Sequence, residues 1–195
     1  MKLYVMRHPE PIGADGLCYG QTDLDVTEEA LRKTTLYLQT LLVDKTLDLL
    51  LTSPLTRCQK LAVELGAALQ VDPVIDNRLI EMSFGIWEGL RWEEIDAQAF
   101  DEWSADYVNI EAPGGESFGA VLLRVENLLE ELKQTDVEAV ALVAHAGVIR
   151  ALLSAVLDIP LVSTWQFGIN YGTLLELSIG TEQWQNRLLS MTVGS

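Results

Sequence analysis

Short apolar segments alternate along the chain with longer stretches whose apolar residues recur at helical spacing. The short segments predict strands at residues 3–6, 47–51, 74–75, 139–144, 174–179 and 187–192. The helical spacing predicts helices near residues 27–42, 53–69, 118–132 and 148–157. Segment 139–144 reads AVALVA and contains no polar residue, which is typical of a strand buried on both faces.

This alternation of strands and helices predicts an α/β fold with a mostly parallel sheet. We expect three layers, α/β/α, with the sheet in the middle. The length of 195 residues fits a single domain, 1–195. Within it, residues from about 83 to 116 read as an irregular, Trp-rich insert with short helices. Ligand sites in such folds form beyond the carboxyl ends of the strands, so the residues that follow each strand are the candidates for chemistry.

Three helix starts carry capping signals. Thr27 precedes two glutamates and predicts an N-cap for the first helix. Ser53 and Pro54 directly follow a predicted strand, with Ser53 as the expected N-cap and Pro54 in the first helical position. Ser117 is the expected cap of the helix that begins near residue 118.

The charge and the apolar runs exclude several classes of partner. A formal net charge of −16 argues against nucleic acid or an anionic membrane surface. A small anionic substrate remains compatible, because the field inside a pocket is set by the nearest few groups. No apolar run approaches the ~20 residues that cross a bilayer. The first residues lack the features of a signal peptide, so we expect a cytoplasmic protein.

The scarce basic residues gather after strands. The only two histidines are His8 and His145, and each follows a predicted strand. Arg7 precedes His8, and Arg57 lies in the first turn of the predicted helix 53–69. A helix N-terminus favours phosphate, and a guanidinium group binds phosphate oxygens in a bidentate manner. Two arginines and two histidines from three strand ends therefore predict a cationic phosphate pocket.

Five segments, in order, span nearly the whole chain: RHPEP at 7–11, SPLTRC at 53–58, LIEMSFGIWEG at 79–89, PGGES at 113–117 and AHAGVIR at 144–150. Together they resemble the motifs of the histidine phosphatase superfamily, which includes the phosphoglycerate mutases. The resemblance implies a phosphoglycerate mutase-like fold. The chain departs from the family pattern at Pro9 and at Ala146, where the family has, or often has, glycine.

The resemblance and the chemistry of phosphoryl transfer give these residues roles. Neutral His8 would be the nucleophile and would form a phosphohistidine. Arg7, Arg57 and a protonated His145 would bind the phosphate oxygens, so no metal or other cofactor is expected. Glu81 would protonate the leaving oxygen and later activate water, helped by the apolar residues around it.

Further residues are weaker candidates. Gln21 is expected at the phosphate and Thr22 at the phosphate or a neighbouring hydroxyl, with a plain turn role as the alternative for both. Glu10 is a weaker candidate than Glu81 for the acid, since it lies close to His8 in sequence, and it is also a substrate-binding candidate. Trp87 could stack on a flat base, whereas most aromatic residues of the insert are expected to form a satellite core. Cys18 and Cys58 are expected to be buried thiols, although Cys18 could lie near the site.

The substrate prediction depends on residues 18–23, CYGQTD, and on the RHPEP form of the first motif. Both resemble the α-ribazole-phosphate phosphatases of cobalamin synthesis. The resemblance implies removal of the 5′-phosphate from α-ribazole phosphate or from its cobalamin-linked form. The expected partner is thus a small phosphorylated metabolite, and a homodimer is possible.

Other activities remain open at this stage. Within the same superfamily, the alternatives are a broad-specificity phosphatase and a phosphoglycerate mutase. Outside it, the alternatives are a non-catalytic phosphoester-binding module and a metal-dependent hydrolase with His8, Glu10 and His145 as ligands. Against the last, the spacing of these ligands fits no common metal motif, and the arginines would repel a cation.

Overall fold

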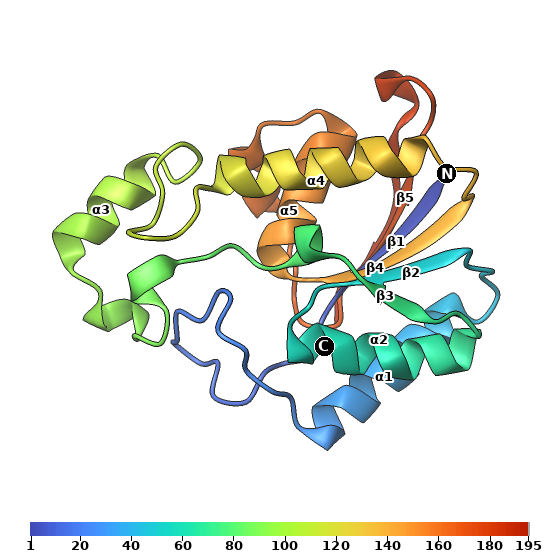
Figure 1. Cartoon of the computed structure of the whole chain (residues 1–195), viewed down its shortest axis with the longest axis horizontal. Coiled ribbons are helices and arrows are strands. Elements are labelled where there is room, and N and C mark those ends of the chain that lie inside the picture. The colour runs from blue at the N-terminus through green and yellow to red at the C-terminus, as the bar shows by residue number, and fades with distance from the viewer. Residues whose placement is uncertain (195) are drawn as a thin grey trace.

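A computed structural model describes residues 1–194 and contains a six-stranded mixed sheet. Its strands are β1 (Lys2–Arg7), β2 (Leu49–Thr52), β3 (Pro73–Ile75), β4 (Ala139–Ala144), β5 (Leu174–Ser178) and β6 (Arg187–Thr192). The strand order is β3-β2-β4-β1-β5-β6 (Figure 1). The first four strands in this order are mutually parallel, whereas β5 runs antiparallel to β1, and β6 to β5. The predicted α/β fold with a mostly parallel sheet is confirmed.

Helices cover both faces of the sheet, which gives the three expected layers (Figure 1). The helices α1 (Glu28–Leu42) and α2 (Thr56–Leu69) lie on one face. The helices α4 (Phe118–Lys133) and α5 (Ala146–Leu157) lie on the other. Shorter 3₁₀ helices connect these elements: η1 (Asn77–Leu79), η2 (Gly85–Trp87), η3 (Trp92–Glu94), η4 (Leu161–Gln166) and η5 (Gln183–Gln185). No helix in residues 1–194 combines the length and apolarity needed to cross a membrane.

The alternation of side chains along the central strands separates two cores. In β1, Leu3 and Val5 pack against α4 and α5, whereas Tyr4 and Met6 pack towards α1 and α2. The same division runs along the neighbouring strand β4. A strand with a helical layer on each side must be apolar at every position, which explains the AVALVA sequence of residues 139–144.

Two of the three predicted helix caps are confirmed. The Thr27 hydroxyl accepts a hydrogen bond from the Ala30 amide at 3.1 Å and opens α1. The Ser117 hydroxyl accepts one from the Ala120 amide at 3.2 Å and opens α4. Each bond satisfies a backbone N–H that has no partner within the helix.

The third predicted cap, at Ser53, is wrong. The helix α2 begins at Thr56, and Leu55 occupies the N-cap position without a side-chain bond. The Ser53 hydroxyl lies instead 2.7 Å from Nε2 of His145, inside the molecule. Ser53 is fully buried, so a contact with another buried polar group takes the place of the cap.

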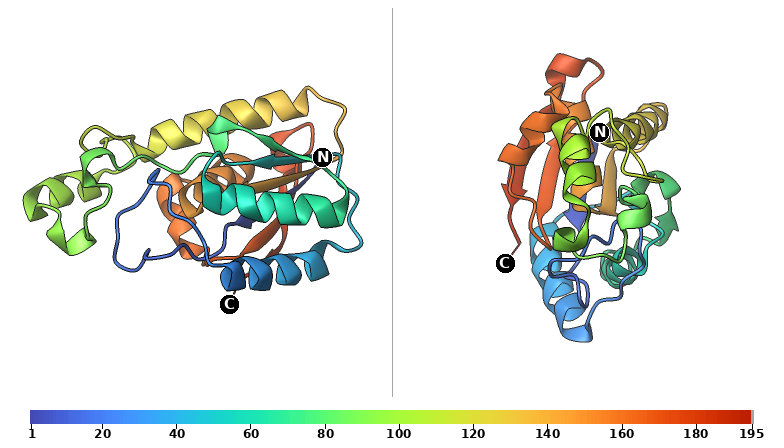
Figure 2. Two further views of the ribbon diagram at one scale, coloured as in Figure 1. Left: turned by 60° about the horizontal axis from the view of Figure 1, so that its bottom comes forward. Right: turned by 90° about the vertical axis from the view of Figure 1, so that its left-hand side faces the viewer.

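Residues 83–116 form a lobe that projects from one end of the molecule, where Figure 2 shows helix α3 (Ala97–Ala105) farthest from the sheet. The lobe has a small core in which Trp87, Ile95 and Ala112 pack with Cys18 from the loop that follows β1. Both views place the lobe beyond the carboxyl ends of the parallel strands. The lobe therefore lies on the side of the sheet where a ligand site is expected.

Candidate active site

Three parallel strands bring the predicted site residues to one edge of the sheet. The strands β1, β4 and β2 are adjacent, and they end next to His8, His145 and Ser53 respectively. The His8 and His145 rings lie 5.0 Å apart between centroids, and both side chains are buried. Arg57 faces inwards from the first turn of α2 and has no exposed surface.

His8 is held in one orientation by its own chain. Its Nδ1 atom lies 2.6 Å from the Pro9 carbonyl oxygen, and because a carbonyl can only accept, Nδ1 carries the proton and Nε2 is the free nitrogen. Burial lowers the pKa of His8 well below its ordinary value, and the charges of Arg7 and Arg57 lower it further. His8 is therefore a neutral imidazole with a free Nε2 lone pair, the form that can attack phosphorus.

His145 has two partners, one directly after β2 and one in α2. Its Nε2 atom lies 2.7 Å from the Ser53 hydroxyl and 3.4 Å from the Cys58 sulfur. Burial lowers the pKa of His145 well below its ordinary value, and His8, Arg57 and Arg7 add to this effect. The expected protonated state is thus not favoured in the protein by itself. A phosphate dianion among these cations would favour the proton again.

The Arg57 guanidinium is bound by a loop. Its Nη1 atom donates to the Thr22 carbonyl at 2.8 Å, and its Nη2 atom donates to the Gly20 carbonyl at 2.6 Å. The Tyr19 ring lies 5.1 Å from its central carbon. Residues 19–22 thus determine where this group points.

Arg7 is held in the same way by a different segment. Its Nη1 atom donates to the Ile169 carbonyl at 2.6 Å, and its guanidinium lies 4.0 Å from the centroid of the Tyr171 ring. The Nε atoms of both Arg7 and Arg57 are buried and have no hydrogen-bond partner. Within residues 1–194, no carboxylate lies within 4.0 Å of either guanidinium. Free positive charge and free buried donors together favour an anion.

Glu81 lies beside the start of α5, close to His145. One carboxylate oxygen accepts from the Met82 amide at 2.9 Å and the other from the Gly147 amide at 3.2 Å. A side chain at position 147 would collide with this carboxylate, so the close approach requires glycine there. The structure therefore brings Glu81 to the same strand ends as the two histidines.

Gln21 and Thr22 occupy the loop that binds Arg57, but their side chains bond to other parts of the protein. The side-chain nitrogen Nε2 of Gln21 donates to the backbone carbonyl of Glu81 at 2.9 Å and to a Glu116 carboxylate oxygen at 3.3 Å. The Thr22 hydroxyl donates to Glu88 at 2.7 Å. The alternative turn role fits these contacts, and a direct contact with phosphate stays a prediction for both residues.

Two other candidates differ in their exposure to solvent. Trp87 is only 4% exposed and packs against Trp103 and Phe100, as expected for a satellite core, and its stacking on a substrate stays a prediction. Glu10 is exposed, and its role in substrate binding stays a prediction. No three His, Cys, Asp or Glu side chains within residues 1–194 form a group that could hold a metal, so His8, Glu10 and His145 are not gathered as ligands.

Sequence reasoning missed the residues that orient the predicted ones. Ser53 was expected to cap a helix, and Glu88 and Tyr171 were given no role. Glu88 belongs to the segment 79–89, but this motif does not indicate which residues Glu88 contacts. Nothing in the local sequence distinguishes Tyr171.

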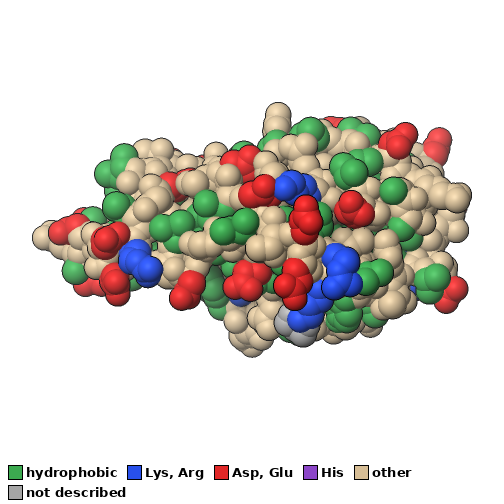
Figure 3. All heavy atoms as spheres, turned by 90° about the horizontal axis from the view of Figure 1, so that it is seen from below, with side chains coloured by type: hydrophobic (Ala, Val, Ile, Leu, Met, Phe, Trp, Pro, Cys, Tyr) green, Lys and Arg blue, Asp and Glu red, His purple; other side chains and the backbone are tan. Residues whose placement is uncertain are grey.

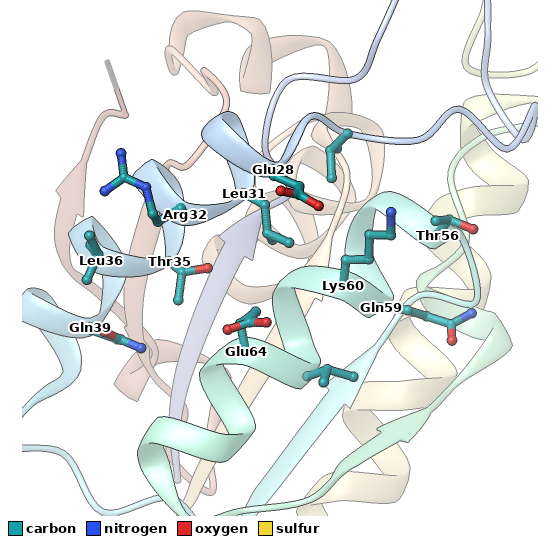
Figure 4. A pocket seen from close by; sticks show the side chains of 12 residues that line it. Glu28, Leu31, Arg32, Thr35, Leu36, Gln39, Thr56, Gln59, Lys60 and Glu64 are labelled. Carbon is teal, nitrogen blue, oxygen red and sulfur yellow. The ribbon is translucent and has the colours of Figure 1, made fainter.

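A groove with a volume of about 770 Å³ lies apart from these residues, between α1 and α2 (Figure 4). Leu31 and Thr35 line it from α1, and Lys60 and Glu64 from α2. None of the predicted catalytic residues borders it. The outer surface seen in Figure 3 carries many scattered carboxylates, which contrasts with the buried cations at the strand ends.

Comparison with known proteins agrees with this geometry. The model of the histidine phosphatase superfamily (branch 1) matches residues 3–192. Phosphoserine phosphatase 1 of Hydrogenobacter thermophilus is 29% identical, over 99% of this chain and 92% of that protein. The adenosylcobalamin/alpha-ribazole phosphatase of Salmonella typhimurium is 30% identical, over 88% of this chain and 87% of that protein.

Among solved structures, the alpha-ribazole phosphatase from Shigella flexneri has a TM-score of 0.88 and 28% identity, and the match covers 100% of this chain and 99% of that one. The fold and the side chains gathered at the strand ends define a phosphatase enzyme. The chain belongs to the histidine phosphatase superfamily, branch 1.

Proposed function

We propose that this phosphatase hydrolyses a phosphate monoester through a phosphohistidine formed on His8. The observation that most supports this proposal is the pair of arginines beside a neutral histidine. Arg7 and Arg57 keep a buried, unpartnered Nε–H each and have no carboxylate partner within residues 1–194. An unpaired buried donor costs free energy, and phosphate oxygens would satisfy both at once.

In the first step, Nε2 of His8 attacks phosphorus in line with the leaving oxygen. The new N–P bond forms as the P–O bond to the leaving alcohol breaks. Arg7, Arg57 and His145 contact the three remaining oxygens and stabilise their charge. The bond from Nδ1 of His8 to the Pro9 carbonyl keeps the ring oriented and stabilises the charge that it gains.

Glu81 completes both steps as the proton donor and acceptor. It gives a proton to the leaving oxygen as the alcohol departs. The resulting carboxylate then takes a proton from a water molecule, whose oxygen attacks phosphorus and releases His8 and inorganic phosphate. The amides of Met82 and Gly147 hold the carboxylate in place through both steps.

For the substrate, we propose α-ribazole 5′-phosphate or its cobalamin-linked form. Residues 18–23 and the RHPEP motif support this assignment. So do the 30% identity to the Salmonella typhimurium protein and the close structural match to the Shigella flexneri protein. A second candidate is phosphoserine, supported by the relative from Hydrogenobacter thermophilus, which matches almost the whole chain. A broad-specificity phosphatase and a mutase complete the alternatives. A cytoplasmic location and the absence of nucleic-acid or membrane partners stay predictions from sequence.

The substrate is tested by kcat/KM on a panel that contains α-ribazole 5′-phosphate, phosphoserine, 3-phosphoglycerate and p-nitrophenyl phosphate. A preference of about 100-fold or more for the first would support the cobalamin assignment, because substrate contacts of 2–3 kcal/mol correspond to such a ratio. A preference for phosphoserine, or a flat profile, would replace it. A coupled assay for the two phosphoglycerate isomers detects a mutase.

The mechanism is tested with His8→Ala. Turnover should fall by about 10⁴-fold or more, since removal of a catalytic nucleophile has effects of this size. Acid-labile labelling by a ³²P-phosphorylated substrate should disappear from the variant and be present in the wild type. Full activity of the variant would end the proposal.

A further inference from the structure

We propose that Glu88 is a positioning residue that orients Arg57 through the loop of residues 20–22. This inference rests on the proposed function, because it assigns Arg57 to the phosphate. Glu88 touches neither Arg57 nor the histidines in any hydrogen bond of the structure. Its influence passes through the backbone of the loop.

The first link joins the loop to Arg57. Both hydrogen bonds of the guanidinium end on loop carbonyls, those of Gly20 and Thr22. The side chain is fully buried and has no salt bridge within residues 1–194. The position of the guanidinium is therefore set by where the loop places these two oxygens.

The second link joins the loop to Glu88. One carboxylate oxygen accepts from the Gln21 amide at 2.9 Å and from the Phe84 amide at 3.0 Å. The other accepts from the Thr22 amide at 2.6 Å and the Thr22 hydroxyl at 2.7 Å. Four hydrogen bonds to one carboxylate tie residues 21–22 to the start of η2, and bonds to an ionised acceptor are the stronger kind.

The tight packing around Gly20 supports the same arrangement. Gly20 has a positive φ of 31°, and a Cβ there would lie 2.5 Å from a Glu88 carboxylate oxygen and 2.6 Å from the Met82 carbonyl oxygen. The loop thus lies directly on Glu88 with no room for a side chain. A displacement of the carboxylate would move the carbonyls that bind Arg57.

This indirect contact has a chemical reason. A carboxylate bonded directly to Arg57 would orient it but would also neutralise the charge that phosphate needs. Glu88 orders the loop by accepting backbone N–H groups, and the loop presents carbonyl oxygens to Arg57. The guanidinium is oriented by dipoles and keeps its full charge. Positioning of this kind determines how well a group stabilises a transition state.

The test compares Glu88→Gln with the wild type for binding of inorganic phosphate, measured by isothermal titration calorimetry. The amide keeps the size of the side chain but replaces one acceptor oxygen by a donor, so about half of the four bonds are lost. We expect the Kd for phosphate to rise about 10-fold and kcat/KM to fall by at least as much, as is usual when a residue that orients a ligand-binding group is changed. Glu94→Gln is the matched control and should change neither value, because Glu94 is exposed and accepts only from the Arg91 amide.

A double-mutant cycle separates positioning from general destabilisation. In an Arg57→Ala background, Glu88→Gln should have no further effect on the phosphate Kd, since the group that it orients is gone. Equal effects of Glu88→Gln in both backgrounds would overturn the proposal. Thr22→Val removes only the hydroxyl bond to Glu88 and provides a milder variant, with an expected rise in Kd of about 3-fold. If Glu88→Gln does not fold, an unchanged Kd in Thr22→Val would overturn the proposal instead.

Failure of the proposed function would give a different set of phosphate-binding results from failure of the role of Glu88. In that case wild-type protein would not bind phosphate, or would bind it equally well without Arg57. Phosphate binding that needs Arg57 but is unchanged by Glu88→Gln would leave the phosphatase proposal in place and remove the role of Glu88.

Discussion

The candidate active site has a side rich in basic residues and a side rich in acidic residues, and the two sides use different backbone groups as hydrogen-bond partners. The strand-end cluster, Arg7, His8, Arg57 and His145, is positive, and its arginines donate to backbone carbonyls. The carboxylate cluster, Glu81, Glu88 and Glu116, is negative, and its members accept from backbone amides. Neither side pairs directly with the other within residues 1–194.

This difference shows how an acidic protein keeps positive charge available. The chain has 13 Lys and Arg against 29 Asp and Glu, so direct pairing of each arginine would be easy. Instead, backbone carbonyls orient Arg7 and Arg57. Backbone amides bind the carboxylate cluster, in which Glu116 also pairs with Arg124 at 3.4 Å. Dipoles satisfy hydrogen-bonding capacity without cancelling a net charge, so Arg7 and Arg57 can still attract phosphate.

Among the changes to the charged groups of the two clusters, the largest expected effect comes from removing an arginine of the positive side. Arg57→Ala should lower kcat/KM by about 10³-fold, the size of effect that arginines have in phosphoryl transfer. The reason is the loss of charge stabilisation on the transferred oxygens. Arg91→Ala, at an exposed arginine of the lobe, is the matched control and should retain activity. A loss below 10-fold for Arg57→Ala would show that this arginine does not bind the phosphate.

A change on the negative side should depend on the leaving group. Glu81→Gln removes the proton donor and should lower kcat/KM, which reports the step that releases the alcohol, by about 10²-fold or more for an alkyl phosphate. The loss in kcat/KM should be much smaller for p-nitrophenyl phosphate, whose phenolate leaves without a proton. Steady-state kinetics on both substrates checks this. Equal losses would assign Glu81 a structural role through its bonds to Met82 and Gly147.

The lowered pKa values of His8 and His145 predict a pH dependence of stability. Below their ordinary pKa of about 6.5 the unfolded chain takes up two protons that the folded protein does not bind. The unfolding free energy should therefore fall as the pH drops below 6.5, by about 1.4 kcal/mol per pH unit for each histidine. Urea unfolding between pH 7.5 and 5 measures this slope.

The control for that slope is the double variant His8→Asn, His145→Asn, which should lose the pH dependence in this range. Asp48 and Asp76 also have lowered pKa values, but their contribution is lost only at more acidic pH, below about 4. An identical slope in the double variant would assign the pH dependence to other groups.

The smallest expected effect concerns Ser53. Its hydroxyl bonds to the ring of His145 and is neither a backbone group nor a charged group. Ser53→Ala leaves Nε2 of His145 with only the Cys58 sulfur and should cost about 1 kcal/mol of unfolding free energy. Ser104→Ala, at a surface hydroxyl that bonds to the Asp101 carbonyl, should cost less. Thermal or urea unfolding of both variants checks the order, and the reverse order would contradict the role of the buried bond.

Much of the fold was predictable because its signals are local. The apolar run at 139–144 identified a central strand, and Thr27 and Ser117 identified the helices they cap. Ser53 failed as a cap signal because its hydroxyl contacts His145, which is 92 residues away in the sequence. Capping rules consider only neighbouring residues, whereas His145 comes close to Ser53 only when β2 and β4 pair.

The sequence by itself determined the fold class and the identity of the strand-end cluster. These residues lie at the ends of β1, β2 and β4 or within a few residues of them, and parallel strands bring their carboxyl ends to one edge whatever the loops do. Only the tertiary structure decided how the cluster is oriented and charged. Both depend on how loops distant in sequence pack together. This packing determines the contacts of Arg57 with Gly20 and Thr22, the four bonds of Glu88 and the burial that lowers the pKa of both histidines. Most of these hydrogen bonds have a backbone group as one partner, and every residue type carries such groups, so the sequence contains no signal that specifies them.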